Sequence, residues 1–243
     1  MKHGKKYLDA KKQYTPEQSY PLAEAVEILR KIKYAKYDET VNLTVNLGVN
    51  PKYPDQMVRG TVALPHGTGK LVRVLVLAGG DKVKEAQEAG ADFAGGVELV
   101  EKIQTEGWVD YDRVIATPDM MKHVGKLGKI LGPRGLMPNP KVGTVTPNVA
   151  AAIQAAKAGQ IEFKVDKQGI IHVPTGKASF DSRKLYENTL VVVNALLRAK
   201  PPTAKGVYMK RITLNATHGP AIRVDITAAR NEIDEAKRTH VLA

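Results

Sequence analysis

The residue types that could carry catalysis are few in this chain, and their spacing is unlike that of a catalytic site. Gly67-Thr68-Gly69-Lys70 is similar to the end of a phosphate-binding P-loop. Such a loop requires a glycine five positions before its Gly-Lys pair and a Ser or Thr after the lysine. Leu64 and Leu71 occupy these positions, and the segment precedes a predicted strand instead of following one. We therefore expect a flexible connection here.

Other reactive groups are equally sparse. Gly79-Gly80 follows a predicted strand, as in a dinucleotide-binding turn, but Asp81 stands where that turn needs its second glycine. No two histidines have the spacing of zinc ligands, there is no cysteine, and none of the three serines lies in a nucleophile elbow. We predict no catalytic residue, no metal, no cofactor and no small-molecule substrate. The alternative is a nucleotide-dependent enzyme.

The charge indicates a polyanionic partner. The 243 residues include 37 Lys and Arg against 25 Asp and Glu, a net charge of +12. Because each neutralised phosphate releases counterions, this excess favours nucleic acid, although a merely soluble basic surface is the alternative. Aromatic residues make up only 5% of the chain. We therefore expect structured RNA or duplex, contacted through phosphates and shape, and not a single strand held by base stacking.

No segment is suited to a membrane. The chain has no apolar run of the about 18 residues that a membrane span requires. The basic residues at the start are not followed by the apolar stretch of a secretory signal. We expect a cytoplasmic protein without a membrane partner.

Hydrophobic patterns divide the chain into regions of two kinds. Apolar residues recur at helical spacing over 22–32, and residues 41–47 alternate as in a half-buried antiparallel strand. Dense apolar runs at 71–78 and 113–116 are typical of buried parallel strands, and they alternate with predicted helices. The two-residue period returns at 161–165, where Asp166-Lys167-Gln168-Gly169 predicts a hairpin turn.

These patterns predict an α+β domain formed from both chain termini, residues 1–66 and 160–229, with an inserted three-layer α/β domain at 67–159. A long helix at 181–199 and strands at 207–215 and 221–226 complete the first domain. Both crossings between the domains contain glycine, and we expect a hinge at Gly67, Gly69 and Gly159. The tail, residues 230–243, is mixed in charge and predicts frayed helix or disorder.

Residues 121–141 hold five basic residues and no acidic one. Gly132, Pro133, Gly135 and Pro138 favour an irregular loop that exposes backbone N–H groups and Arg134 to phosphate. Packing over the core of the inserted domain is an equally good explanation of this loop.

The same segment closely resembles the signature of the bacterial large-subunit ribosomal protein L-one family, the universal family of the ribosomal stalk. Other segments that resemble the family occur in the same order over nearly the whole chain, at 35–41, 58–67, 90–92, 116–119, 176–180 and 217–220. The resemblance implies an inserted domain that is Rossmann-like. It also implies a protein in the large subunit that binds large-subunit ribosomal RNA at the mobile stalk and assists release of deacylated tRNA from the exit site.

Such a protein is a monomer within the ribosome and a translational repressor that binds its own-operon mRNA. A regulator that never enters ribosomes is the alternative. Carried over by motif, the ribosomal RNA and mRNA site comprises Lys36, Tyr37, Thr40, Asp166, Lys167, His172, Ser179, Thr217, His218 and Gly219. Candidates for tRNA contact are Lys52, Arg59, Lys122 and Lys126.

The chemistry of the carried-over residues suits RNA. Lysines neutralise phosphates, threonine and serine hydroxyls bond 2′-hydroxyls, and Gly219 permits close approach of an RNA backbone. Two residues depart from the family pattern, since Tyr37 stands where Phe is usual and His218 where Met is usual. The imidazole replaces an apolar contact with a titratable one, which changes the packing expected against RNA.

Overall fold

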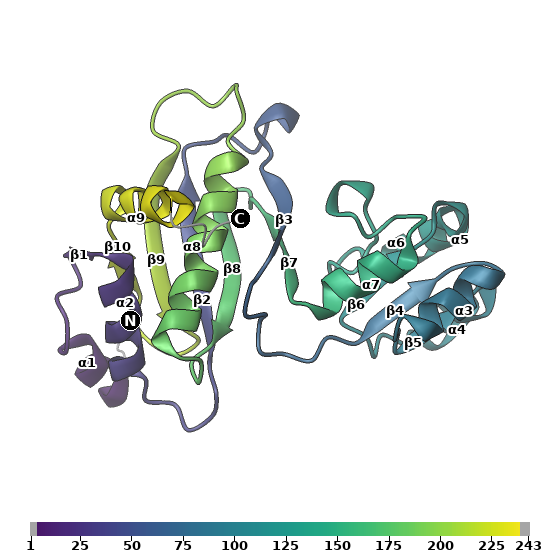
Figure 1. Cartoon of the computed structure of the whole chain (residues 1–243), viewed down its shortest axis with the longest axis horizontal. Helices are drawn as coiled ribbons and strands as arrows, with labels where there is room; N and C mark the ends of the chain where they lie inside the picture. The colour runs from purple at the N-terminus through teal and green to yellow at the C-terminus, as the bar shows by residue number, and fades with distance from the viewer. Residues whose placement is uncertain (1–3, 239–243) are drawn as a thin grey trace. The chain divides into compact units, whose positions relative to one another are not determined.

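The computed structural model describes residues 4–238, and the chain divides into two compact units. Unit 1 consists of residues 1–69 and 161–243, and unit 2 of residues 70–160. Figure 1 shows that both units combine helices with sheets. No helix in the described part of the chain has the length and apolar character to cross a membrane.

Unit 1 is built on a five-stranded sheet in the order β1-β10-β9-β2-β8. The strands are β1 (Ser19–Tyr20), β2 (Thr40–Leu47), β8 (Ile170–Lys177), β9 (Met209–Ala216) and β10 (Ile222–Val224). β2 lies between β9 and β8 and is antiparallel to both, whereas β1 and β10 are parallel. The antiparallel strand predicted at 41–47 is confirmed.

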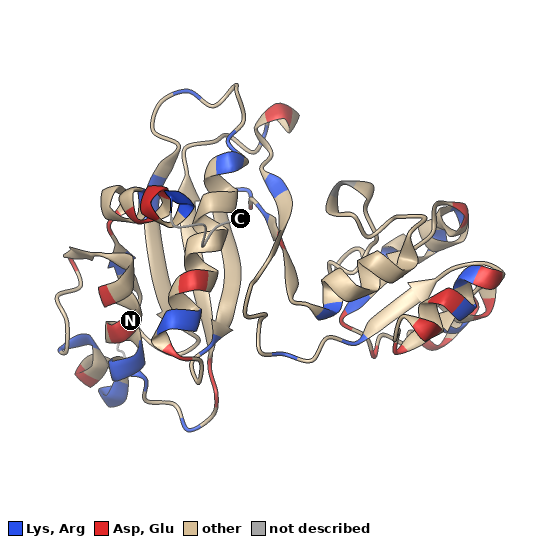
Figure 2. Cartoon of the chain, in the orientation of Figure 1, with Lys and Arg blue, Asp and Glu red and all other residues tan. Residues whose placement is uncertain are grey.

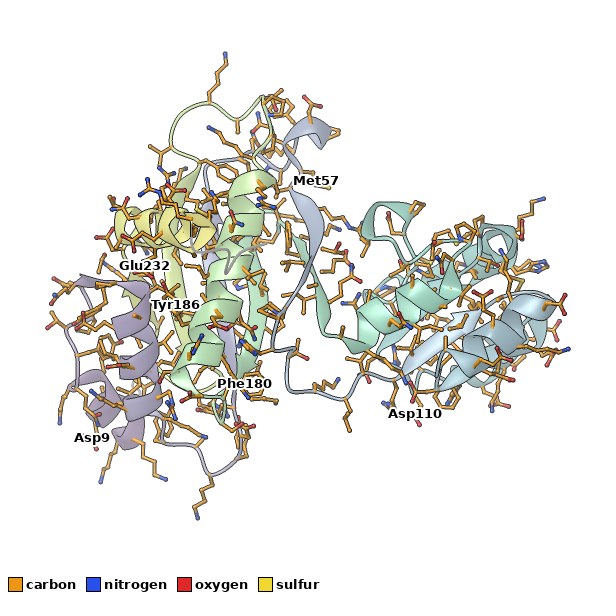
Figure 3. All side chains as sticks on the ribbon, viewed as in Figure 1. Asp9, Met57, Asp110, Phe180, Tyr186 and Glu232 are labelled. Atoms are coloured by element: carbon orange, nitrogen blue, oxygen red, sulfur yellow. The ribbon has the colours of Figure 1, made fainter. Side chains whose placement is uncertain are left out.

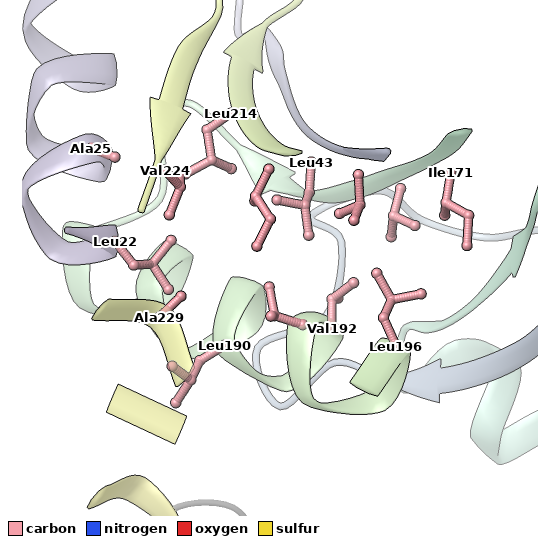
Figure 4. Close-up of a cluster of buried hydrophobic side chains, with 14 of the residues drawn as sticks. Leu22, Ala25, Leu43, Ile171, Leu190, Val192, Leu196, Leu214, Val224 and Ala229 are labelled. Atoms are coloured by element: carbon pink, nitrogen blue, oxygen red, sulfur yellow. The ribbon is translucent and has the colours of Figure 1, made fainter. Parts of the chain in front are cut away.

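One face of this sheet is covered by helices. The helices of unit 1 are α1 (Lys5–Lys11), α2 (Leu22–Ile32), α8 (Ser182–Arg198) and α9 (Ile226–Arg238). β2 alternates without interruption between half-exposed and buried residues. Figure 4 shows Leu43 and Ile171 of the sheet facing Val192 and Leu196 of α8. Burying these side chains, at about 1.5–3 kcal/mol each, is what fixes the register of β2.

The hairpin predicted around residue 167 is wrong. β7 (Gln160–Lys164) pairs with β3 (Arg59–Ala63) in a separate two-stranded sheet, while β8 joins β2. The turn itself does form, because the Asp166 carboxylate accepts hydrogen bonds from the N–H groups of Gln168 and Ile170, both at 2.8 Å. The chain therefore changes sheets at this turn.

Unit 2 contains a parallel sheet in the order β5-β4-β6. Its strands are β4 (Val74–Leu77), β5 (Phe93–Gly95) and β6 (Arg113–Ala116), and its larger helices are α3 (Asp81–Glu88), α4 (Val97–Glu106) and α7 (Val149–Lys157). All four β4 side chains are buried, since one apolar cluster lies on each face of the sheet. Double burial explains the apolar run from Val74 to Ala78, whereas Leu71, which was expected in the same strand, precedes it and is 94% exposed. Figure 2 shows charges of both signs on α3 and α4.

The signature segment of unit 2 forms the short helices α5 (Met121–Val124) and α6 (Gly128–Leu131), with single 3₁₀ turns at Gly125–Leu127 and Pro140–Val142. Another 3₁₀ turn, Pro118–Met120, precedes the segment. A further 3₁₀ turn, Pro54–Gln56, precedes β3 in unit 1.

Of the two states expected for the tail, the structure has helix as far as residue 238. Residues 226–238 form helix α9, in which Ala229 and Ile233 are buried against unit 1. The Glu232 carboxylate accepts a hydrogen bond from the N–H of Leu22 at 3.3 Å, at the start of α2. Four-residue apolar spacing inside a charged segment therefore makes an amphipathic helix. Residues 239–243 lie outside the described part of the chain.

Candidate nucleic-acid interface

The carried-over residues at the two ends of the chain meet at one end of the five-stranded sheet. The Thr217 hydroxyl donates to the Thr40 carbonyl at 3.2 Å, and Lys177 Nζ donates to Thr40 Oγ1 at 3.2 Å. Ser179 donates from its N–H and its hydroxyl to the carboxylate of Asp38, at 2.9 and 2.8 Å. Residues 36–40, 177–179 and 217–219 are called the Thr40 cluster below.

A buried carboxylate fixes the turn that carries His218. Glu39 is only 1% exposed, and its Oε1 accepts a hydrogen bond from the His218 N–H at 3.1 Å. The Tyr34 hydroxyl donates to the His218 carbonyl at 2.6 Å. Desolvation raises the pKa of Tyr34, so this hydroxyl stays protonated and able to donate. Both backbone groups of His218 are thereby satisfied by protein.

The side chains of Lys36, Tyr37 and His218 in the Thr40 cluster are exposed to solvent. Tyr37 is 52% exposed, and its ring meets the His218 imidazole edge-on with centroids 5.7 Å apart. The departure from the family pattern at both positions thus creates an aromatic pair. Lys36 is exposed and is not in an ion pair with any described residue. Its ammonium is available to an anion.

His172 is the third residue of β8 and lies on the sheet face that the helices leave uncovered. It is opposite Thr44, and His172 Nδ1 and Thr44 Oγ1 are 3.2 Å apart. Across β2, Thr44 is opposite Thr213, whose hydroxyl donates to the Thr44 carbonyl at 3.3 Å. The other half-exposed positions of β2 and β9 continue this polar row: Asn42, Asn46 and Asn215.

Asp166 and Lys167 lie apart from the Thr40 cluster. β8 separates them from it, and eight residues of strand span about 24 Å. In Figure 3, Phe180 marks the end of the sheet near the Thr40 cluster and Met57 marks the opposite end. Here Lys52 and Lys167 line one open groove of about 690 Å³ together with Pro51, Met57, Lys164, Val165 and Asp166. This is called the basic groove below.

The remaining tRNA candidates differ in availability. The Arg59 guanidinium is ion-paired with Glu162, at 2.6 Å from Nη2 to Oε1, and only 24% of its side chain is exposed. Lys122 and Lys126 are exposed on unit 2. Arg59 therefore has a structural partner, whereas the two lysines project into solvent.

One part of the signature loop packs on the core of unit 2, and another part is exposed to solvent. Leu136 and Met137 pack on the cluster beneath α4, Pro138 is buried, and the Leu136 N–H donates to the Leu131 carbonyl at 3.0 Å. Gly135 adopts a φ of +71°, which only glycine accepts at little cost. Gly132 and Pro133 are exposed together with Arg134. The loop covers the core of unit 2 and still presents one guanidinium.

The residues of the expected hinge are tied to their own units. The Gly67 carbonyl accepts from Asn188 Nδ2 at 3.0 Å, and the His66 N–H donates to Asn188 Oδ1 at 3.1 Å. A Cβ at Gly69 would lie 2.8 Å from the Phe180 ring. Gly159 has a φ of +92° at the second crossing. No group of three or more potential metal ligands occurs among residues 4–238.

Comparison with known proteins decides the family. The model of the ribosomal protein L1p/L10e family matches residues 29–220. The chain belongs to this family. It is 58% identical over 224 residues to the large ribosomal subunit protein uL1 of Solibacter usitatus (strain Ellin6076), which covers 92% of this chain and 94% of that protein. The family consists of structural ribosomal proteins, so the resemblance found in the sequence is confirmed and the chain is not an enzyme.

Several residues of this L1-family surface escaped the sequence analysis. Glu39, Asp38 and Tyr34 hold the Thr40 cluster in place, and Lys164 joins the basic groove. The alternation of Thr and Asn at 40–46 was the available signal for the polar sheet face. Nothing local marks Glu39 as a partner of His218, because 179 residues separate them.

Proposed function

We propose that this L1-family protein binds a folded element of large-subunit ribosomal RNA through the Thr40 cluster, at the mobile stalk. Ribosomal RNA binding is general for the family. The observation that carries the proposal is the bond from Thr217 to the Thr40 carbonyl, which joins two carried-over segments in one rigid surface. The backbone there is satisfied internally, so the hydroxyl oxygens of Thr217 and Ser179, as acceptors, and the Lys36 ammonium remain available to RNA.

Each group has a role that its chemistry supports. Lys36 neutralises a phosphate, and the hydroxyl oxygens of Thr217 and Ser179, whose protons are engaged, accept bonds from 2′-hydroxyls. His172 and Thr44 extend the surface along β2 toward the basic groove. The lysines of that groove, Lys52, Lys164 and Lys167, neutralise phosphates about 24 Å from Thr40. One folded RNA thereby touches both ends of the sheet.

The same surface binds the chain's own-operon mRNA when that message presents a similar fold. Because both RNAs compete for Thr40 and Thr217, free protein represses translation once ribosomal RNA is saturated. The exit-site tRNA is contacted through Lys122 and Lys126, which have no acidic partner among the described residues, whereas Lys52 belongs to the basic groove and serves ribosomal RNA. Arg59 takes no part in this contact, since Glu162 holds it.

The proposal assigns a different role to each unit. The discontinuous RNA-binding domain corresponds to unit 1 and the inserted domain to unit 2. Asn188 anchors the first crossing as far as Gly67 and Gly69 packs against Phe180, so movement begins beyond Gly69, and at Gly159 in the second crossing. The residues before each hinge point move with one unit, and the residues after it move with the other.

A dissection experiment tests the proposal. A single chain joining residues 1–69 to 161–243 is compared with residues 70–160 in filter binding to large-subunit ribosomal RNA. Circular dichroism first establishes that each piece is folded. The joined chain is expected to bind close to the affinity of the full protein and the insert far more weakly. Tighter binding by the insert would overturn the proposal.

A further inference from the structure

A second groove in unit 1 has features of a different kind of site. It holds about 660 Å³ between residues 60–65 on one side and α8 on the other, where Val191, Asn194, Ala195 and Arg198 line it. β3, which supplies most of the first wall, has β7 as its only strand partner in the described part of the chain. One edge of β3 is therefore unpaired.

The α8 wall contains a polar group without a partner. Asn194 is 6% exposed, and its Oδ1 has no hydrogen-bond partner among the described residues. A buried unpaired carbonyl is costly, and native proteins keep very few of them. Asn194 belongs to none of the segments assigned to RNA. Its retention in the groove wall points to a ligand that supplies an N–H.

β7 packs against β3 at the start of the groove. Gly60 has no side chain, and a Cβ there would lie 2.8 Å from the Phe163 ring. The Phe163 ring of β7 therefore covers Gly60, and the edge of β3 away from β7 is the one left open. A strand edge lined on the far side by a helix is the geometry in which extended peptides are recognised, with main-chain hydrogen bonds to the edge and side chains in alternate pockets.

The charge of the groove selects the kind of occupant. Arg198 is its one charged lining residue, and it forms no ion pair within residues 4–238. Binding of a nucleic-acid backbone requires several cations in a row, and stacking requires an exposed ring, whereas Phe163 is 3% exposed. An extended protein segment with one carboxylate forms backbone hydrogen bonds with the open edge of β3 and an ion pair with Arg198.

We propose that the groove between β3 and α8 binds an extended, acidic protein segment as an additional strand on β3. Backbone groups of the segment pair with the open edge of β3, and one of its N–H groups bonds Asn194 Oδ1. β-branched residues contact Val191 and Ala195, and an Asp or Glu, or a terminal carboxylate, pairs with Arg198. This surface is distinct from the Thr40 cluster and independent of RNA binding.

Selection from a library of random linear peptides displayed on phage tests the proposal with the intact protein. The expected peptides alternate β-branched and polar residues and carry an acid at a fixed position. A synthetic peptide of the selected sequence is then titrated against R198E, N194L and R230E. Arg230 is an equally exposed arginine on α9, outside the groove.

R198E is expected to weaken binding at least about tenfold and to prefer the same peptide with Lys in place of the acid. N194L, which keeps the volume of the side chain, also weakens binding about tenfold, whereas R230E leaves it unchanged. Thermal unfolding checks that each variant is folded. If N194L unfolds, the test rests on R198E, because Arg198 is exposed. The proposal is overturned if no sequence is enriched, if R198E binds as well as R230E, or if ribosomal RNA displaces the peptide.

Discussion

The Thr217 hydroxyl lies 3.2 Å from the Thr40 carbonyl, although 177 residues separate the two in sequence. Four residues further along β2, Thr213 makes the equivalent bond to the Thr44 carbonyl at 3.3 Å. Thr217 differs in lying just beyond the end of β9, in the exposed turn that Glu39 holds. The surface near Thr40 therefore exists only when both ends of the chain are folded together.

Removing the Thr217 hydroxyl should weaken RNA binding without unfolding the protein. T217A leaves a hydrogen-bonding group of the RNA buried and unpaired, so we expect a loss of about 1–3 kcal/mol in binding free energy, measured by filter binding. T217S keeps the hydroxyl and should retain most of the affinity. Unchanged affinity in T217A would remove this residue from the site.

Two lysines at opposite ends of the sheet should each contribute one phosphate contact. K36A and K167A are each expected to lower the slope of log affinity against log salt by about 1 in magnitude, because one fewer counterion is released. K84A, an exposed lysine on α3, is the matched control and should leave the slope unchanged. Equal slopes in all four proteins would refute both assignments.

Asn188 should determine where the first crossing becomes mobile. N188A removes the bonds to His66 and Gly67, with a predicted loss of about 1–3 kcal/mol of folding stability. Amide hydrogen exchange at His66 should become faster. The control is N148A, which removes a side chain that caps α7 in unit 2. Exchange at His66 that is as slow in N188A as in the parent protein would contradict the anchoring role.

Glu187 should make this region sensitive to acid. Hydrogen bonds from His66 and then Arg183 hold the pKa of its carboxyl below the ordinary value near 4.5. The folded state thus favours the ionised form, and this stabilisation is fully present above that value and lost as the pH falls through the folded-state pKa. In E187Q the unfolding midpoint should fall less steeply below about pH 5 than in the parent protein. Parallel curves would show that the pKa shift has no effect on stability.

The sequence predicted a strand correctly where only one kind of sheet produces the observed hydrophobic pattern. The alternation at 41–47 corresponds to a sheet with one covered face, and residues 74–77 of the apolar run at 71–78 correspond to a sheet with two. The alternation at 161–165 did not reveal that β7 pairs with β3, since the period of two identifies a strand and not its neighbour. In the tail, charged residues concealed the spacing of Ala229 and Ile233.

The site was predictable only in part for the same reason. Motif resemblance located residues 36–40 and 217–219, which the structure brings together, but it also grouped them with Asp166 and Lys167, at the far end of β8. The support of His218 by Glu39 and Tyr34 depends on tertiary contacts that no local pattern encodes. The pairing of Arg59 with Glu162 likewise becomes visible only once β3 and β7 are adjacent.

Hydrogen–deuterium exchange of the intact protein, with and without large-subunit ribosomal RNA, tests the central claim most directly. RNA is expected to slow exchange in residues 36–40, 177–179 and 217–219, with weaker protection around Lys167. Protection confined to residues 121–141 of unit 2, with none in those three segments, would contradict it.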